Sequence, residues 1–205
     1  MMELIAAGRR RLADVFGGLS ETQWRAPSLC EGWTVAHVVA HMTMPFRISE
    51  REFALGMQQA NGRFDEFSDA VANRDSELPQ TALVAALRDN AGHPWMPPGG
   101  GLAGALSHDT IHGLDITWPL SITCPIADEA MTIVLDLIVG EGGRSLFGFD
   151  LAGVQLAATD LDWSSGAGAP LEGRSRDLLL LIAGRTIPPD LFSGPGARRL
   201  ETARQ

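Results

Sequence analysis

Four of the five histidines in the chain fall into two pairs with the spacing His-x-x-x-His. His37 pairs with His41, and His108 pairs with His112. Residues four apart lie one above the other on the same face of a helix, so both imidazoles of a pair can reach a single ion. One such pair alone is more often a surface or core feature. Two pairs on separate helices of a bundle can enclose a cavity from both sides.

The number of imidazoles that meet would decide the kind of metal site. Four imidazoles would fill the sites of a tetrahedral ion and indicate a structural role, whereas three would leave an open position for water or substrate. The sequence alone leaves both possibilities open. The two cysteines, Cys30 and Cys124, are far apart and outside any Cys-x-x-Cys motif. No basic residue near Cys30 in the sequence would activate its thiol, so we interpret Cys30 as a packing residue.

Composition narrows the classes of partner. The chain has 205 residues, a net charge of −9, 45% hydrophobic residues and 20% charged residues, which is ordinary for a globular protein. An acidic chain with no basic run is a poor partner for nucleic acid or for an anionic membrane surface. The first residues place charges where a secretory signal would be apolar, and no uncharged apolar run is long enough to span a bilayer. We therefore expect a cytoplasmic protein.

Hydrophobic periodicity predicts mostly helices, joined by loops rich in Pro and Gly. Ser20 to Gln23 has the form of a capping box, Thr34 is a candidate N-cap, and Pro45 should kink its helix or start a new segment. Residues 61–77 are weakly periodic and are predicted to be a helix end plus a connection. The main predicted helices cover residues 3–19, 79–91, 102–116 and 128–140. A further helix begins after Thr34, and its pattern resumes beyond Pro45 through Ile48, Phe53 and Leu55.

The pattern changes near the C-terminus. Residues 153–163 alternate in the manner of a strand, and residues 176–183 are typical of a helix. We therefore predict a mainly α protein, with a helical bundle over residues 1–148 and a small α/β unit over residues 149–205.

Several motifs resemble those of a known family. Two segments resemble the DinB-like superfamily. The first runs from Trp24 through the Gly-Trp-Thr of residues 32–34 to His41, and the second is residues 111–116 (Ile-His-Gly-Leu-Asp-Ile). Within this superfamily, the sequence is most similar to the mycothiol-dependent maleylpyruvate isomerase group. The resemblance implies a DinB-like four-helix bundle, and residues 158–164 and 191–196 resemble the small C-terminal unit of those proteins.

The resemblance also implies a set of metal ligands. When the family's metal ligands are carried over position by position, they fall on His41, His108 and His112. The middle position is often Glu in the isomerases and is His108 in this chain. Zinc is the expected ion, and nickel could take its place. His37 is expected to lie in an outer shell or on the surface. Asp115, one turn after His112, is expected either to orient a ligand imidazole or to cap a turn.

Three further residues, Asp109, Trp95 and Glu141, lie outside these motifs. Asp109 is expected to face solvent, and Trp95 is a candidate pocket residue. Asp115 and Glu141 are the candidate general acids or bases near the metal. The sequence does not identify residues that would bind the thiol cofactor.

The activity implied by the resemblance is thiol activation, with mycothiol as cosubstrate and a small electrophile as substrate, in an S-transferase or isomerase reaction. Two alternatives stay open: a metal-dependent hydrolase, and a non-catalytic module that binds a metal or small ligand. The partners would be small molecules, and a homodimer is compatible with the sequence.

Overall fold

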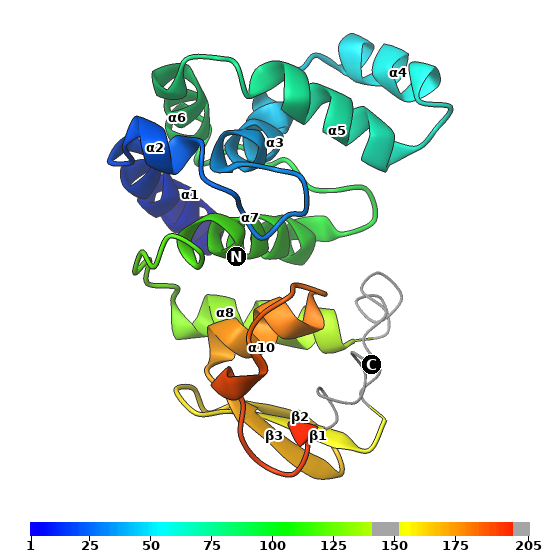
Figure 1. Ribbon diagram of the computed structural model, residues 1–205. Coiled ribbons are helices and arrows are strands. Elements are labelled where there is room, and N and C mark those ends of the chain that lie inside the picture. Colours follow the sequence, from blue (N-terminus) through cyan, green and yellow to red (C-terminus); the bar gives the residue numbers. More distant parts are fainter. Residues whose placement is uncertain (141–151, 199–205) are drawn as a thin grey trace. The chain divides into compact units, whose positions relative to one another are not determined.

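The computed structural model describes residues 1–140 and 152–198 of the chain (Figure 1). It is mainly helical with a small sheet, as predicted. The chain is divided into two compact units, Met1–Pro125 and Ile126–Gln205. The predicted boundary after residue 148 lies outside the described residues. Helix α8 (Asp128–Val139), which the sequence assigned to the bundle, packs with α10 (Ser175–Ile182) in the second unit.

The first unit is a helical bundle. Helix α1 packs against α6 and α7, and α3 packs against α5, α6 and α7. Apolar residues from these helices, among them Phe16, Trp24, Val38 and Leu87, form a shared core. The helices of this unit are α1 (Met2–Gly17), α2 (Glu21–Trp24), α3 (Val35–Arg47), α4 (Glu50–Gln59), α5 (Phe64–Asp75), α6 (Gln80–Asp89) and α7 (Gly101–Thr117).

Local signals determine where several of these helices begin and end. The predicted capping box is present at Ser20, and Thr34 is the N-cap of α3. Pro45 lies inside α3, which ends two residues later, and Ser49 caps the new helix α4 with a second capping box. Pro45 lacks a backbone donor, and the predicted break follows within the same turn, after Arg47.

The prediction for residues 61–77 is wrong, because residues 64–75 form the helix α5. Its buried face carries the apolar residues Phe67 and Val71, but also the polar residues Ser68 and Asp75. Those polar positions interrupt the apolar period that the prediction depended on. Both are stabilised by contacts with α3: Ser68 with His41, and Asp75 with Arg47.

The second unit combines helices with a three-stranded sheet. The strands are β1 (Val154–Ala158), β2 (Ser164–Gly166) and β3 (Ala169–Gly173), in the order β2-β1-β3. Strand β1 is antiparallel to β2 and parallel to β3. The indole Nε1 of Trp163 donates to Asp136 Oδ1 on α8 at 2.8 Å, which fixes the sheet to that helix. A short 3-10 helix, Pro189–Leu191, follows α10. Among the described residues, no helix is long and apolar enough to cross a membrane.

Candidate metal centre

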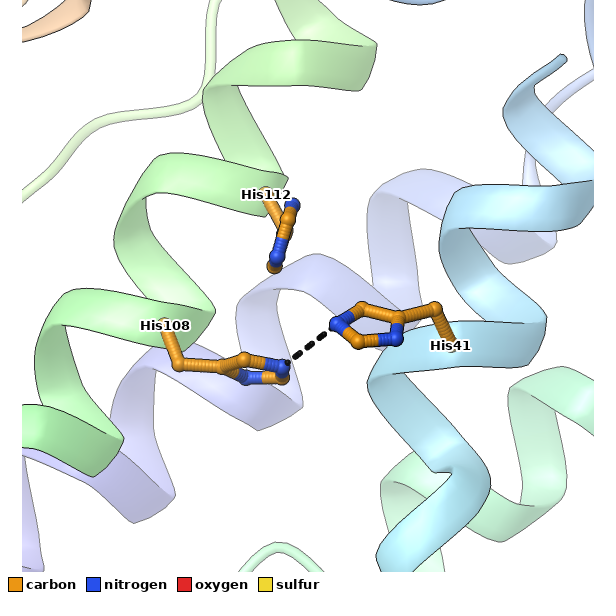
Figure 2. Close-up of side chains that lie close together, drawn as sticks. All are labelled: His41, His108 and His112. Atoms are coloured by element: carbon orange, nitrogen blue, oxygen red, sulfur yellow. Dashed lines mark hydrogen bonds between the residues drawn. The ribbon is translucent and has the colours of Figure 1, made fainter. Parts of the chain in front are cut away.

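Three imidazoles from two helices point toward one another in the bundle (Figure 2). His41 comes from α3, and His108 and His112 come from consecutive turns of α7. The Nε2 atoms of His41 and His108 are 3.2 Å apart, and one ring nitrogen of each of the three residues lies within 4.8 Å of the other two. The ring centroids are 4.8 to 5.1 Å apart. The structure thus brings together the three predicted ligands.

The two imidazoles on α7 are each oriented by a carboxylate. His108 Nδ1 lies 3.0 Å from Asp109 Oδ1, and His112 Nδ1 lies 3.0 Å from Asp115 Oδ2. An ionised carboxylate can only accept a hydrogen bond, so each Nδ1 carries the proton. The Nε2 of each ring is then the nitrogen with a free lone pair. This is the tautomer that a metal ligand bound through Nε2 requires.

His41 is held by a hydroxyl in place of a carboxylate. Its Nδ1 lies 2.8 Å from Ser68 Oγ on α5, and the side chain is buried. Burial lowers the pKa of His41 well below its ordinary value, and the neighbouring His112 and His108 lower the pKa further. Asp115 acts in the opposite direction. His41 is therefore neutral at physiological pH, which is the protonation state that binds a metal.

Asp109 does not face solvent, so that prediction is wrong. Its side chain is buried between His108 and Arg9, whose Nε donates to Asp109 Oδ2 at 2.7 Å. Arg9 is itself fully buried, donates to the carbonyl of His93 at 2.8 Å and lies over the ring of Phe46. A charge pair buried this deeply has little freedom to move. It therefore fixes the ring of His108 through the contact between Asp109 Oδ1 and His108 Nδ1.

Asp115 has a second donor that the sequence did not reveal. The Cys30 Sγ donates to Asp115 Oδ2 at 3.1 Å and lies 3.8 Å from His112 Nδ1. The backbone N–H of Leu29 donates to the carbonyl of Asp115 at 3.0 Å, which ties the loop before α3 to the end of α7. Cys30 is therefore part of the surroundings of the site, and its interpretation as a packing residue was incomplete.

His37 lies apart from the three imidazoles. Its Nδ1 is 2.7 Å from Thr34 Oγ1, and its Nε2 is 3.2 Å from Asn73 Oδ1. The first contact completes the cap of α3. The second connects α3 to α5. His37 therefore stabilises helix ends, and it is not among the groups of side chains that could hold a metal ion in the described part of the chain.

Two tryptophans contact the ligand rings. Trp33 lies 5.2 Å from the ring of His41, and Trp95 lies 5.1 Å from the ring of His108, measured between centroids. The indole Nε1 of Trp33 donates to Asp69 Oδ1 at 2.8 Å, which fixes that ring. Trp95, a candidate pocket residue from the sequence, thus lies beside the site. Glu141 lies outside the described residues.

The donors suit a small divalent ion. Two nitrogens bound to a tetrahedral ion with bonds of about 2.0 to 2.1 Å are roughly 3.4 Å apart. The measured separation between His41 Nε2 and His108 Nε2 is 3.2 Å. Three neutral imidazoles of this kind would leave a fourth position open. Fold and site together define a helical-bundle protein with a candidate three-histidine metal centre.

Comparison with known proteins relates the N-terminal part of the chain to a known family. The family model described as "Mycothiol maleylpyruvate isomerase N-terminal domain" matches residues 5–93, a region that contains His41 and ends before His108. The N-terminal part of the chain is therefore similar to the mycothiol maleylpyruvate isomerase family. No curated protein sequence matches the chain.

Two solved structures have a similar fold. The crystal structure of the mycothiol-dependent maleylpyruvate isomerase has 15% sequence identity and a TM-score of 0.59, and the alignment covers 95% of this chain and 91% of that one. A variant of the same enzyme with one histidine replaced by alanine has 16% identity, the same TM-score and the same coverage. Identity at this level shows a shared fold.

Proposed function

We propose that the protein binds one divalent metal ion through His41, His108 and His112 and activates a low-molecular-weight thiol for reaction with a small electrophile. The thiol we propose is mycothiol, because the description of the matching family model names mycothiol and the two similar structures are described as mycothiol-dependent. The observation that carries the proposal is the convergence of three imidazoles, two of them oriented by buried carboxylates.

The side chains around the site have separable roles in this proposal. The three imidazoles hold the ion, and Asp109 and Asp115 keep the two rings of α7 in the binding tautomer. A bound divalent ion would supply positive charge that ionises a coordinated thiol near neutral pH. The rings of Trp33 and Trp95 would restrict water beside a reactive sulfur.

The all-imidazole donor set affects the chemistry. The ligand atoms of His41, His108 and His112 are neutral, so the set carries one negative charge fewer than two imidazoles and a carboxylate would. A more electrophilic site makes a bound thiol more acidic and so favours its ionisation. We propose zinc as the ion, and we expect S-transfer to be faster than maleylpyruvate isomerisation. A cytoplasmic location and a homodimer stay predictions.

The test has two steps, beginning with metal analysis of protein purified without a metal-affinity column. The cobalt-substituted protein is then titrated with mycothiol. A sulfur-to-cobalt charge-transfer band should appear, and the zinc-loaded protein should consume mycothiol in the presence of some members of a panel of electrophiles. His112→Ala should abolish both effects, whereas His37→Ala should retain them.

The alternatives predict other results. An unchanged cobalt spectrum at saturating mycothiol would exclude thiol activation at this site. Hydrolysis of an ester or amide panel by the zinc-loaded protein would then favour a hydrolase. Metal binding without turnover of either panel would indicate a binding module.

A further inference from the structure

A second group of metal-binding side chains adjoins the three-histidine set. Cys30, His112 and Asp115 each offer one ligand atom, and these atoms all lie within 4.8 Å of one another. Cys30 Sγ is 3.1 Å from Asp115 Oδ2 and 3.8 Å from His112 Nδ1. His112 Nδ1 is 3.0 Å from the same carboxylate oxygen. The group therefore uses Nδ1 of His112, whereas the three-histidine set would use Nε2.

The dimensions of this triangle suit a tetrahedral ion. With bonds of about 2.3 Å to sulfur and about 2.0 to 2.2 Å to nitrogen and oxygen, the donors would be roughly 3.4 to 3.6 Å apart. The measured edges of 3.0, 3.1 and 3.8 Å are all close to this range. An ion could enter with small adjustments of the three side chains.

We propose that Cys30, His112 Nδ1 and Asp115 form a second site for a thiophilic divalent ion, such as Zn²⁺ or Cd²⁺. The sulfur ligand selects for ions of this type. On binding, the Cys30 thiol loses its proton to solvent, and the imidazole proton of His112 moves from Nδ1 to Nε2. The thiolate and the carboxylate balance both charges of the ion, which allows it to bind beside the fully buried Asp115.

Because both sites need His112, they compete. An ion at the second site places the imidazole proton on Nε2, the nitrogen that the three-histidine set would use. The first site then retains only His41 and His108. Excess thiophilic metal should therefore weaken metal binding at the first site.

The experiment isolates the second site by removing a ligand that only the first site uses. The metal-free His108→Ala protein is titrated with Cd²⁺ alone, and the ultraviolet sulfur-to-cadmium charge-transfer band is recorded together with bound cadmium. We expect the band to saturate at one ion per chain. Adding Cys30→Ser should abolish the band and weaken cadmium binding at least tenfold.

Cys124→Ser in the same background is the matched control. Cys124 is also half-buried, and burial raises the pKa of its thiol, so it is a poor source of thiolate. This variant should retain the full band. Circular dichroism verifies the fold of each variant, and Cys30→Ala replaces Cys30→Ser if serine unfolds the protein.

Two results would overturn the proposal: no band in His108→Ala at saturating Cd²⁺, or a band that survives the loss of Cys30. The measurement needs neither mycothiol nor an ion at the first site. Failure of the proposed thiol chemistry would therefore leave this test intact, and the reverse also holds.

Discussion

His108 Nε2 lies 3.2 Å from His41 Nε2, although the two residues are 67 positions apart in the sequence. Two imidazole lone pairs facing each other at this distance would repel, so a proton or a cation must lie between them. In the metal-free protein, a proton shared between the rings meets this need. A divalent ion would meet it for all three rings at once. The close approach of the two nitrogens is thus compatible with a shared proton or with a metal ion between the rings.

Replacement of single histidines should identify the metal ligands. His41→Ala, His108→Ala and His112→Ala each remove one of three donors, so each should weaken zinc binding by more than about 100-fold, beyond the loss typical of an outer-shell partner. Competition with a chelating dye measures the affinity. His37→Ala is the control, because its ring bonds to Thr34 and Asn73. Equal loss of zinc in His37→Ala would show that the ligand set is wrong.

The buried pair of Arg9 and Asp109 should affect both stability and metal affinity. Asp109→Asn leaves the fully buried Arg9 without its carboxylate partner, at a cost of about 3–5 kcal/mol in the free energy of unfolding. It should also weaken zinc binding by about 10–100-fold through His108. Denaturant unfolding and the dye competition measure the two effects.

The double variant Arg9→Met/Asp109→Asn separates these effects. Removing both charges should restore part of the stability, because no unpaired charge remains buried. Metal affinity should stay low, because His108 Nδ1 still lacks its carboxylate. Recovery of full affinity in the double variant would show that Asp109 acts on the fold alone.

Asp75 should make stability depend on pH at acidic values. Burial alone would raise the pKa of Asp75, but hydrogen bonds and charges from Arg74 and Arg47 outweigh it and hold the pKa below its ordinary value. A carboxyl whose pKa is lower in the folded state stabilises above its unfolded pKa, and this contribution is lost as pH falls through the folded pKa. Asp75→Asn should therefore cost about 2–3 kcal/mol near neutral pH.

The difference between wild type and Asp75→Asn should stay constant above about pH 5 and shrink below about pH 4. Unfolding in urea across this range measures it. Because Arg47 is on α3 and Asp75 is on α5, the variant should also loosen the contact of Ser68 with His41. A difference that does not change down to pH 2 would contradict this account of the ion pair.

Gly166 should be required for the sheet of the second unit. Its φ is +85°, a left-handed conformation, and an added Cβ would lie 2.5 Å from the carbonyl oxygen of Val154 on β1. Gly166→Ala should therefore destabilise this unit by at least about 1–2 kcal/mol. Limited proteolysis detects the effect as faster cleavage within residues 152–198, which should resist protease in the wild type. Gly92→Ala, with open space around the added Cβ, should not change cleavage.

Much of the fold is predictable from local patterns. Helices α1, α3, α6 and α7 and the strand β1 follow from apolar periodicity, and the helix starts at Ser20 and Thr34 follow from their caps. The spacing of His108 and His112 is sufficient to place them on one face of a helix. Helix α5 was missed because its buried face includes Ser68 and Asp75, whose partners lie on α3.

The sequence by itself determined which residue types could bind a metal. It also determined that His108 and His112 share a helix face, because this property depends only on their spacing within one turn. The family resemblance implied His41 as the third ligand, and tertiary packing brings it beside His108. Tertiary packing alone decided that Asp109 is buried against Arg9 and that Cys30 reaches Asp115. These pairs are separated by 67, 100 and 85 positions. Contacts at such separations depend on how helices pack, and helix packing is a property of the whole core that no local pattern encodes.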